Sequence, residues 1–103
     1  MLAYKAMFKY LDDGIHAGVL DFPGATSWGK DLDQVRQLLA RALVDMAETN
    51  LQRGEALPQP DPNISDPEAD LEEPMYLLMQ AASRIAVVPR DATQPPVRTP
   101  PTS

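Results

Sequence analysis

The stretch Asp21-Phe22-Pro23-Gly24 separates a predicted strand hairpin from a long predicted helix, and this order of elements decides the fold. Proline has no amide hydrogen to give to a sheet, so strand pairing should stop near Phe22. Gly24 permits a sharp change in chain direction. Residues 25–28 then leave room for a third, short strand before the helix.

A strand and a tight turn precede this stretch. Residues 4–11 alternate as a half-buried strand does, with Tyr4, Ala6, Phe8 and Tyr10 on one face and Lys5, Met7 and Lys9 on the other. The sequence Asp12-Asp13-Gly14 is a strong turn signal, and residues 15–20 supply the returning strand. An exposed Met7 on the lysine face would suit an adaptable protein contact.

A long amphipathic helix follows. Asp31 is the expected N-cap, and Gln34, three residues later, completes a capping box. Apolar residues then recur every three or four positions, at Leu32, Val35, Leu38, Leu39, Ala42, Leu43, Met46 and Leu51. The helix should end near Arg53-Gly54. We expect its apolar stripe to cover one face of the sheet, with Leu39 and Leu43 in the core.

The second half of the chain allows more than one interpretation. Residues 57–62 contain three prolines and predict an extended connector across the surface. Residues 75–83 fit either a helix opened by Pro74 or an alternating strand, with a slight preference for the helix. Residues 85–88 predict a further strand, closed by Pro89.

Length and composition predict one domain. The 103 residues leave little room for a second domain, and ten of the eleven prolines lie at or after Pro58. We expect residues 1–90 to fold and the proline-rich residues 91–103 to form a disordered tail. A core of this size is marginally stable, so association into a homodimer or a higher homo-oligomer is expected.

Acidic residues dominate the charge and cluster in one segment. The net charge of −6 disfavours direct binding to nucleic acid, which needs grouped lysine and arginine. The connector segment 61–73 holds six carboxylates without an intervening basic residue, at Asp61, Asp66, Glu68, Asp70, Glu72 and Glu73. Such a segment is either a solvated loop or a surface that attracts a basic protein.

The residue types that carry most catalysis and metal binding are scarce. The chain has no cysteine and a single histidine, His16, within a predicted strand. Asp21 ends a strand, where it is either a catalytic acid or a turn residue that bonds to nearby backbone. Trp28 is either a binding aromatic or a cover over the start of the helix. We therefore predict no enzyme activity, no metal and no cofactor.

No stretch of the sequence has the pattern of a secretion signal or a membrane span. Lysines interrupt the apolar residues near the N-terminus. No run approaches the roughly 18–20 apolar residues of a spanning helix. The expectation is a cytoplasmic protein that does not bind membranes.

These elements, taken together, resemble the HicB family. They are a strand from about Tyr4, an Asp-Gly hairpin turn, Asp-Phe-Pro-Gly at 21–24, Gly29-Lys30-Asp31-Leu32 at the helix start, and Leu57-Pro58-Gln59-Pro60 after it. The match covers about residues 3–60. The resemblance implies an α+β fold of a truncated ribonuclease H type, with a three-stranded antiparallel sheet, a long helix on one face and a further C-terminal strand. Ribonuclease H chemistry needs convergent carboxylates around two metal ions, and residues 4–11 contain none.

The resemblance also implies a function. HicB proteins are antitoxins that bind and neutralise HicA, a small basic toxin that cleaves mRNA. The candidate protein-binding residues of this chain are Trp28 and, in the acidic segment, Asp66, Glu68, Asp70, Glu72 and Glu73. Many members carry a C-terminal DNA-binding segment, which has no counterpart in the pattern after Pro89, so direct DNA binding is not expected. The alternative is a stand-alone, self-associating HicB-like domain without a toxin partner.

Overall fold

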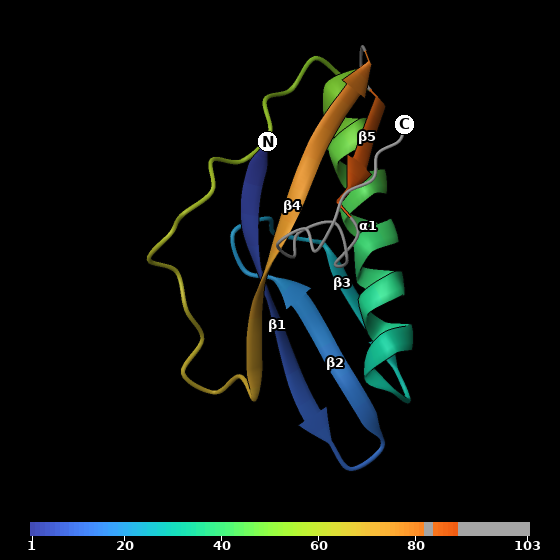
Figure 1. Ribbon diagram of the computed structural model, residues 1–103, viewed down its shortest axis with the longest axis vertical. Coiled ribbons are helices and arrows are strands. Elements are labelled where there is room, and N and C mark those ends of the chain that lie inside the picture. Colours follow the sequence, from blue (N-terminus) through green and yellow to red (C-terminus); the bar gives the residue numbers. More distant parts are fainter. Residues whose placement is uncertain (82–83, 89–103) are drawn as a thin grey trace, which may run out of the picture.

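The fold consists of one helix and one sheet, seen in a computed structural model that describes residues 1–81 and 84–88 (Figure 1). The elements in chain order are β1 (Leu2–Leu11), β2 (Gly14–Val19), β3 (Thr26–Gly29), α1 (Leu32–Gln52), β4 (Leu71–Ala81) and β5 (Arg84–Val87). The chain is therefore an α+β protein, as its sequence predicts. The expected tail at 91–103 lies outside the described residues.

Five antiparallel strands form the sheet, in the spatial order β3-β2-β1-β4-β5. The sequence predicts three paired strands and one further strand, so the fifth strand is a correction. The sheet curls around α1, which lies against β2, β3 and β5 (Figure 1). It thus has an inner face toward α1 and an outer face away from it.

The strand β4 corrects the preferred helical interpretation of residues 75–83. Pro74 lies opposite Lys5 of β1, whose amide donates to the Asp21 side chain and whose carbonyl accepts from the Leu20 amide. Because Lys5 directs both groups toward β2, this pair requires no hydrogen bond from Pro74. Pairing of β4 with β5 begins three residues after the proline, so no ladder bond is lost on that side either.

Alternation along β4 explains where its apolar residues lie. Met75 and Leu77 are buried on the inner face, whereas Leu78 is 43% exposed. A helix would group Met75 with Leu78, but a strand places them on opposite faces. The two-residue period therefore describes this segment correctly.

Both ends of α1 form as predicted. Asp31 Oδ1 accepts from the Gln34 amide at 2.9 Å. The Gln34 side chain accepts in turn from the Lys30 amide at 3.0 Å, one residue before the cap. Arg53 caps the other end, and Gly54 follows with a φ of +75°, which glycine adopts without strain.

The hydrophobic core lies between α1 and the inner face. Its largest fully buried side chains are Tyr4, Phe8, Phe22, Val35, Leu39 and Leu43. This confirms the predicted core positions of Leu39 and Leu43. Met7 requires a correction: it lies on the outer face but is only 8% exposed, so it offers little surface to a partner.

Leu39→Ala should lower the free energy of unfolding by about 2–5 kcal/mol, because removing a fully buried side chain leaves a cavity. Leu78→Ala is the matched control, since it removes the same atoms from a half-exposed site, and it should cost less than about 1 kcal/mol. Urea denaturation followed by circular dichroism measures both. A cost below about 1 kcal/mol for Leu39→Ala would place this helix face outside the core.

Candidate protein-binding surface

Asp21 joins the turn at 21–24 to the connector that leaves α1. Its carboxylate is 8% exposed and accepts two backbone hydrogen bonds, from the Lys5 amide at 2.9 Å and from the Asp61 amide at 3.0 Å. The Tyr4 hydroxyl donates to the Pro58 carbonyl at 2.7 Å. Both carboxylate oxygens of Asp21 are therefore used by the fold, which supports the structural interpretation of this residue over the catalytic one.

Phe22 completes this junction from the other side. Its ring is 2% exposed and meets the Tyr4 ring edge-on, with centroids 5.3 Å apart and an interplanar angle of 70°. Tyr4 therefore packs against the turn through its ring and holds the connector through its hydroxyl. The turn at 21–24 and the connector at 57–61 are thus two halves of one contact.

Asp21→Asn should reduce the free energy of unfolding by about 1–3 kcal/mol, because one buried amide loses its acceptor and faces another amide group instead. Glu55→Gln is the control, since Glu55 is an exposed acid just after α1, and it should be nearly neutral. Urea denaturation compares the two. Equal, negligible effects would show that Asp21 does not hold the connector.

We expect the Tyr4 hydroxyl to make the free energy of unfolding fall as the pH rises through the alkaline range. Burial, and then the nearby Asp21 carboxylate, raise its pKa above the ordinary value of 10.0. The folded protein therefore holds this proton more tightly than the unfolded chain does, so the contribution is complete below about pH 10 and declines as the pH rises through the folded-state pKa.

Tyr4→Phe tests this linkage. It should cost about 1 kcal/mol at neutral pH, through loss of the hydrogen bond to Pro58. The difference in unfolding free energy between wild type and variant should shrink above about pH 10. If this difference in unfolding free energy stayed constant between about pH 8 and about pH 11.5, the account of a buried Tyr4 hydroxyl with a raised pKa would be contradicted.

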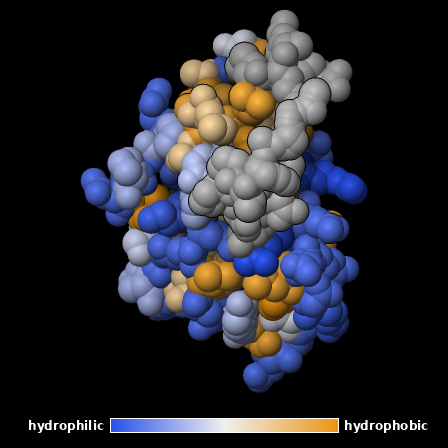
Figure 2. Space-filling view, viewed as in Figure 1, coloured by the Kyte–Doolittle hydropathy of each residue, from blue (hydrophilic) through white to orange (hydrophobic). Residues whose placement is uncertain are grey.

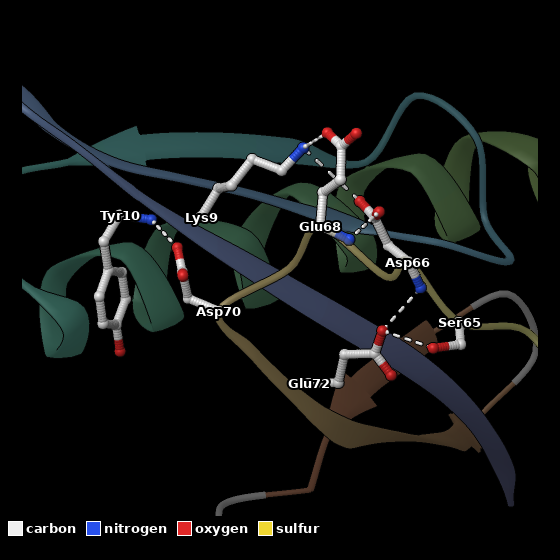
Figure 3. Close-up of polar contacts among 7 residues, drawn as sticks. All are labelled: Lys9, Tyr10, Ser65, Asp66, Glu68, Asp70 and Glu72. Atoms are coloured by element: carbon white, nitrogen blue, oxygen red, sulfur yellow. Dashed lines mark hydrogen bonds and ion pairs between the residues drawn. The ribbon is translucent and has the colours of Figure 1, made fainter.

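The acidic connector is fastened to β1 and β4 by most of its own carboxylates (Figure 3). The Lys9 ammonium lies 3.4 Å from Glu68 Oε1 and 3.8 Å from Asp66 Oδ2. Glu72 Oε2 accepts from the Asp66 amide at 2.7 Å and from the Ser65 hydroxyl at 3.0 Å. The segment is therefore a folded strap over the outer face, rather than a freely solvated loop.

Asp70 fastens the end of the same strap. Its carboxylate accepts from the Tyr10 amide at 2.7 Å (Figure 3). Its own amide donates to the Phe8 carbonyl at 2.9 Å. These bonds lead directly into β4, which begins at Leu71. Glu72 and Glu73 consequently belong to β4, so the connector ends at Asp70.

Glu73 lies apart from the other four candidate acids, on the inner face. Its carboxylate accepts two hydrogen bonds from Arg36 of α1, from Nε at 3.0 Å and from Nη2 at 2.9 Å. These hydrogen bonds raise the pKa of Arg36 above its ordinary value. The Arg36 guanidinium also lies 6.0 Å from the centre of the Phe8 ring. This pair therefore ties α1 to β4 and to the core.

Trp28 lies on the outer face and is 46% exposed. It stands opposite His16 of β2, and His16 stands opposite Lys9 of β1. The cross-strand row Trp28–His16–Lys9 thus leads across the sheet to Glu68 and Asp66. Two regions predicted separately, the tryptophan and the acidic segment, are brought onto one face.

Lys30 covers part of the tryptophan. Its ammonium lies 5.0 Å from the centre of the Trp28 ring and donates to the Asp13 carbonyl at 2.8 Å. A side chain at Gly14 would collide with the indole, at 2.7 Å from its nearest ring atom. Trp28 is therefore held in place between the hairpin turn and a lysine, with about half of its surface left exposed.

The sequence did not indicate a second exposed aromatic, Tyr10. This residue and Leu11 are 52% and 51% exposed, next to the exposed acids Asp12 and Asp13 of the turn. Alternation placed Tyr10 on the core face, but the β1–β2 hairpin projects past the start of α1, where no helix covers it (Figure 1). The feature of the sequence that indicates this exposure is therefore the position of Tyr10 at the end of the strand.

Apolar surface gathers at the opposite end of the sheet. Figure 2 shows hydrophilic residues over much of the lower part of the visible face and hydrophobic ones toward the end where β1 begins. A hollow of about 180 Å³ there is lined by Met1, Leu2, Leu57, Leu77 and Ile85. It presents no side chain suited to catalysis.

Chemical and comparative observations add little to this geometry. The described residues contain no group of three or more His, Asp or Glu side chains placed to hold a metal ion. Among them, no helix combines the length and the apolar character needed to cross a lipid bilayer. Comparisons with known protein families, curated proteins and solved structures found no match.

Proposed function

We propose that this chain is a HicB-like antitoxin domain that binds and neutralises a small, basic, mRNA-cleaving toxin of the HicA type through protein–protein contact. The order of hairpin, Asp-Phe-Pro-Gly turn, short strand, helix and further strand supports this proposal. So do the two contacts that fasten the segment after α1, from Asp21 to the Asp61 amide and from the Tyr4 hydroxyl to the Pro58 carbonyl, since they give the motifs of the resemblance a shared structural role.

One observation carries the proposal most directly: the hairpin end carries exposed carboxylates together with the exposed aromatic Tyr10, whose amide donates to the Asp70 carboxylate. Glu68 has 81% of its side chain exposed, although it pairs with Lys9. Asp70 and the turn acids are exposed as well, beside the half-exposed Tyr10. Arginine side chains bind carboxylates and stack on aromatic rings, so this end suits a basic protein.

The remaining candidate acids stabilise the fold that carries this surface. Asp66 and Glu72 hold the strap in place through backbone hydrogen bonds, and Glu73 lies on the inner face. Changing these residues would disturb the fold as well as the charge. Among the described residues, the Glu68 side chain contacts Lys9 alone, so Glu68 is the most informative position to change.

The direct test is to search the neighbourhood of the gene for a short reading frame that encodes a basic protein, and to co-express that protein with this chain. The proposal expects that the neighbouring protein arrests growth, that this chain restores growth, and that the two proteins co-purify from the cytoplasm. A toxic neighbour whose effect this chain does not relieve would contradict the proposal.

Glu68→Lys should slow association with that partner about three- to tenfold at low salt and have little effect at high salt, because steering by exposed charge acts on the association rate and is screened. Glu55→Lys is the matched control, since it makes the same change at an exposed acid just after α1, far along the chain from the hairpin. Stopped-flow or surface-binding kinetics at two salt concentrations measure both. Equal slowing by the two variants would point to net charge alone.

A stand-alone, self-associating domain is the second candidate function. The edge of the sheet at β3 favours it, because that strand has a neighbour on one side only. This candidate predicts no toxic neighbouring protein and a homo-oligomer in solution.

A further inference from the structure

We propose that β3 pairs antiparallel with β3 of a second copy of this chain, which joins two five-stranded sheets into one across a two-fold axis. This interface is formed by a different strand from the exposed acids at the hairpin end, and it does not depend on the proposed antitoxin function. Its evidence lies in the two edges of the sheet, the side chains beside β3 and the charge of the chain.

The other edge of the sheet is closed by the helix. The Ile85 amide of β5 donates to Glu48 Oε2 of α1 at 3.0 Å. The Val88 amide donates to the Tyr76 carbonyl, so the alternation of an antiparallel pair turns the groups of Ile85 away from β4. The Glu48 carboxylate thus accepts from the Ile85 amide at the edge of β5, which an incoming strand would need as a hydrogen-bond donor.

The edge at β3 is open by the same reasoning. The Val19 amide donates to the Ala25 carbonyl at 2.9 Å, so alternation directs Ser27 toward β2 and turns the backbone groups of Thr26 and Trp28 outward. Within the described residues, these outward N–H and C=O groups form no hydrogen bond to the helix or to a loop. An open edge of this kind is a template for another strand.

Self-pairing of β3 produces a favourable register. When Ser27 stands opposite Ser27 of the second copy, each Trp28 stands opposite the other copy's Thr26. Aromatic and β-branched side chains form stabilising cross-strand pairs, and both residues are exposed in the single chain. The same pairing would cover two half-exposed indoles.

The helix beside β3 offers a second contact. The Ser27 hydroxyl donates to the Val35 carbonyl at 3.1 Å, which places the first turns of α1 over β3. Leu38 follows three residues later and is 38% exposed, although most apolar residues of α1 are covered. A two-fold axis at Ser27 would bring the two Leu38 side chains toward each other.

Charge favours this edge over the rest of the surface. A chain with a net charge of −6 repels a second copy, but residues 25–29 carry no charge. In the proposed register, Lys30 of each copy approaches the other copy's Gly24, which lies against Met46.

The first test is the mass of the wild-type protein, measured by sedimentation equilibrium or light scattering across a concentration series. A dimer of twice 11.3 kDa is expected. Leu38→Lys should weaken the dimer at least tenfold, because it places two ammonium groups at the two-fold axis. Leu78→Lys is the control, since this leucine is similarly exposed on β4, and it should leave the dimer intact.

The second test locates the contact by amide hydrogen exchange. The Thr26 and Trp28 amides should exchange more slowly as protein concentration rises, whereas the Ser27 amide, already directed toward β2, should change little. A monomeric wild-type protein would overturn the proposal. So would a dimer that Leu78→Lys disrupts and whose Thr26 and Trp28 amides stay unprotected. Neither result would bear on whether the acidic hairpin end binds a basic partner.

Discussion

The Asp21 carboxylate joins three parts of the chain that are far apart in sequence: the first strand, the turn after the hairpin and the connector after the helix. It accepts the Lys5 amide where regular pairing of β1 with β2 ends, and the Asp61 amide beyond α1. Because the connector is fixed at Asp61, the following residues are led along β1 and arrive in register as β4. The position of the central strands, and of the acidic strap over them, depends on this contact.

Most of the charge in the acidic segment 61–73 stabilises the protein itself. Asp66, Asp70 and Glu72 bond to backbone amides, and Glu73 binds Arg36 beneath the sheet. A cluster of acids in sequence is therefore not equivalent to an acidic binding surface. The carboxylates left for a partner are those whose structural bonds are few, and they lie with Tyr10 at one end of the molecule.

Local patterns predicted much of the fold because the residues concerned act over short distances. The cap at Asp31, the apolar stripe of α1 and the hairpin turn all rest on contacts within a few positions. Local pattern left β4 open between a helix and an alternating strand. Strand register decides between them, since Pro74 lies opposite Lys5, whose groups face β2. Burial of Met7 has the same origin, because it too depends on segments distant in the chain.

The candidate surface was predictable only in part. Charge identified the acidic segment, and the sequence left Trp28 open between a binding aromatic and a cover over the helix start, but their meeting on one face follows from strand register. Alternation correctly places Tyr10 on the same face as Tyr4 and Phe8, but Tyr10 is exposed because the hairpin extends beyond the helix. Neither fact can be read from residue types alone.

Amide hydrogen exchange at Asp61, followed by nuclear magnetic resonance, tests the role of Asp21 most directly. Asp61 lies in an irregular, proline-rich segment, where an amide would ordinarily exchange rapidly. Because it donates to the buried Asp21 carboxylate, we expect protection comparable to that of amides in β1 and β4, and loss of that protection in Asp21→Asn. Rapid exchange at Asp61 in the wild-type protein, as fast as at the exposed Ala56, would contradict the central role given to this carboxylate.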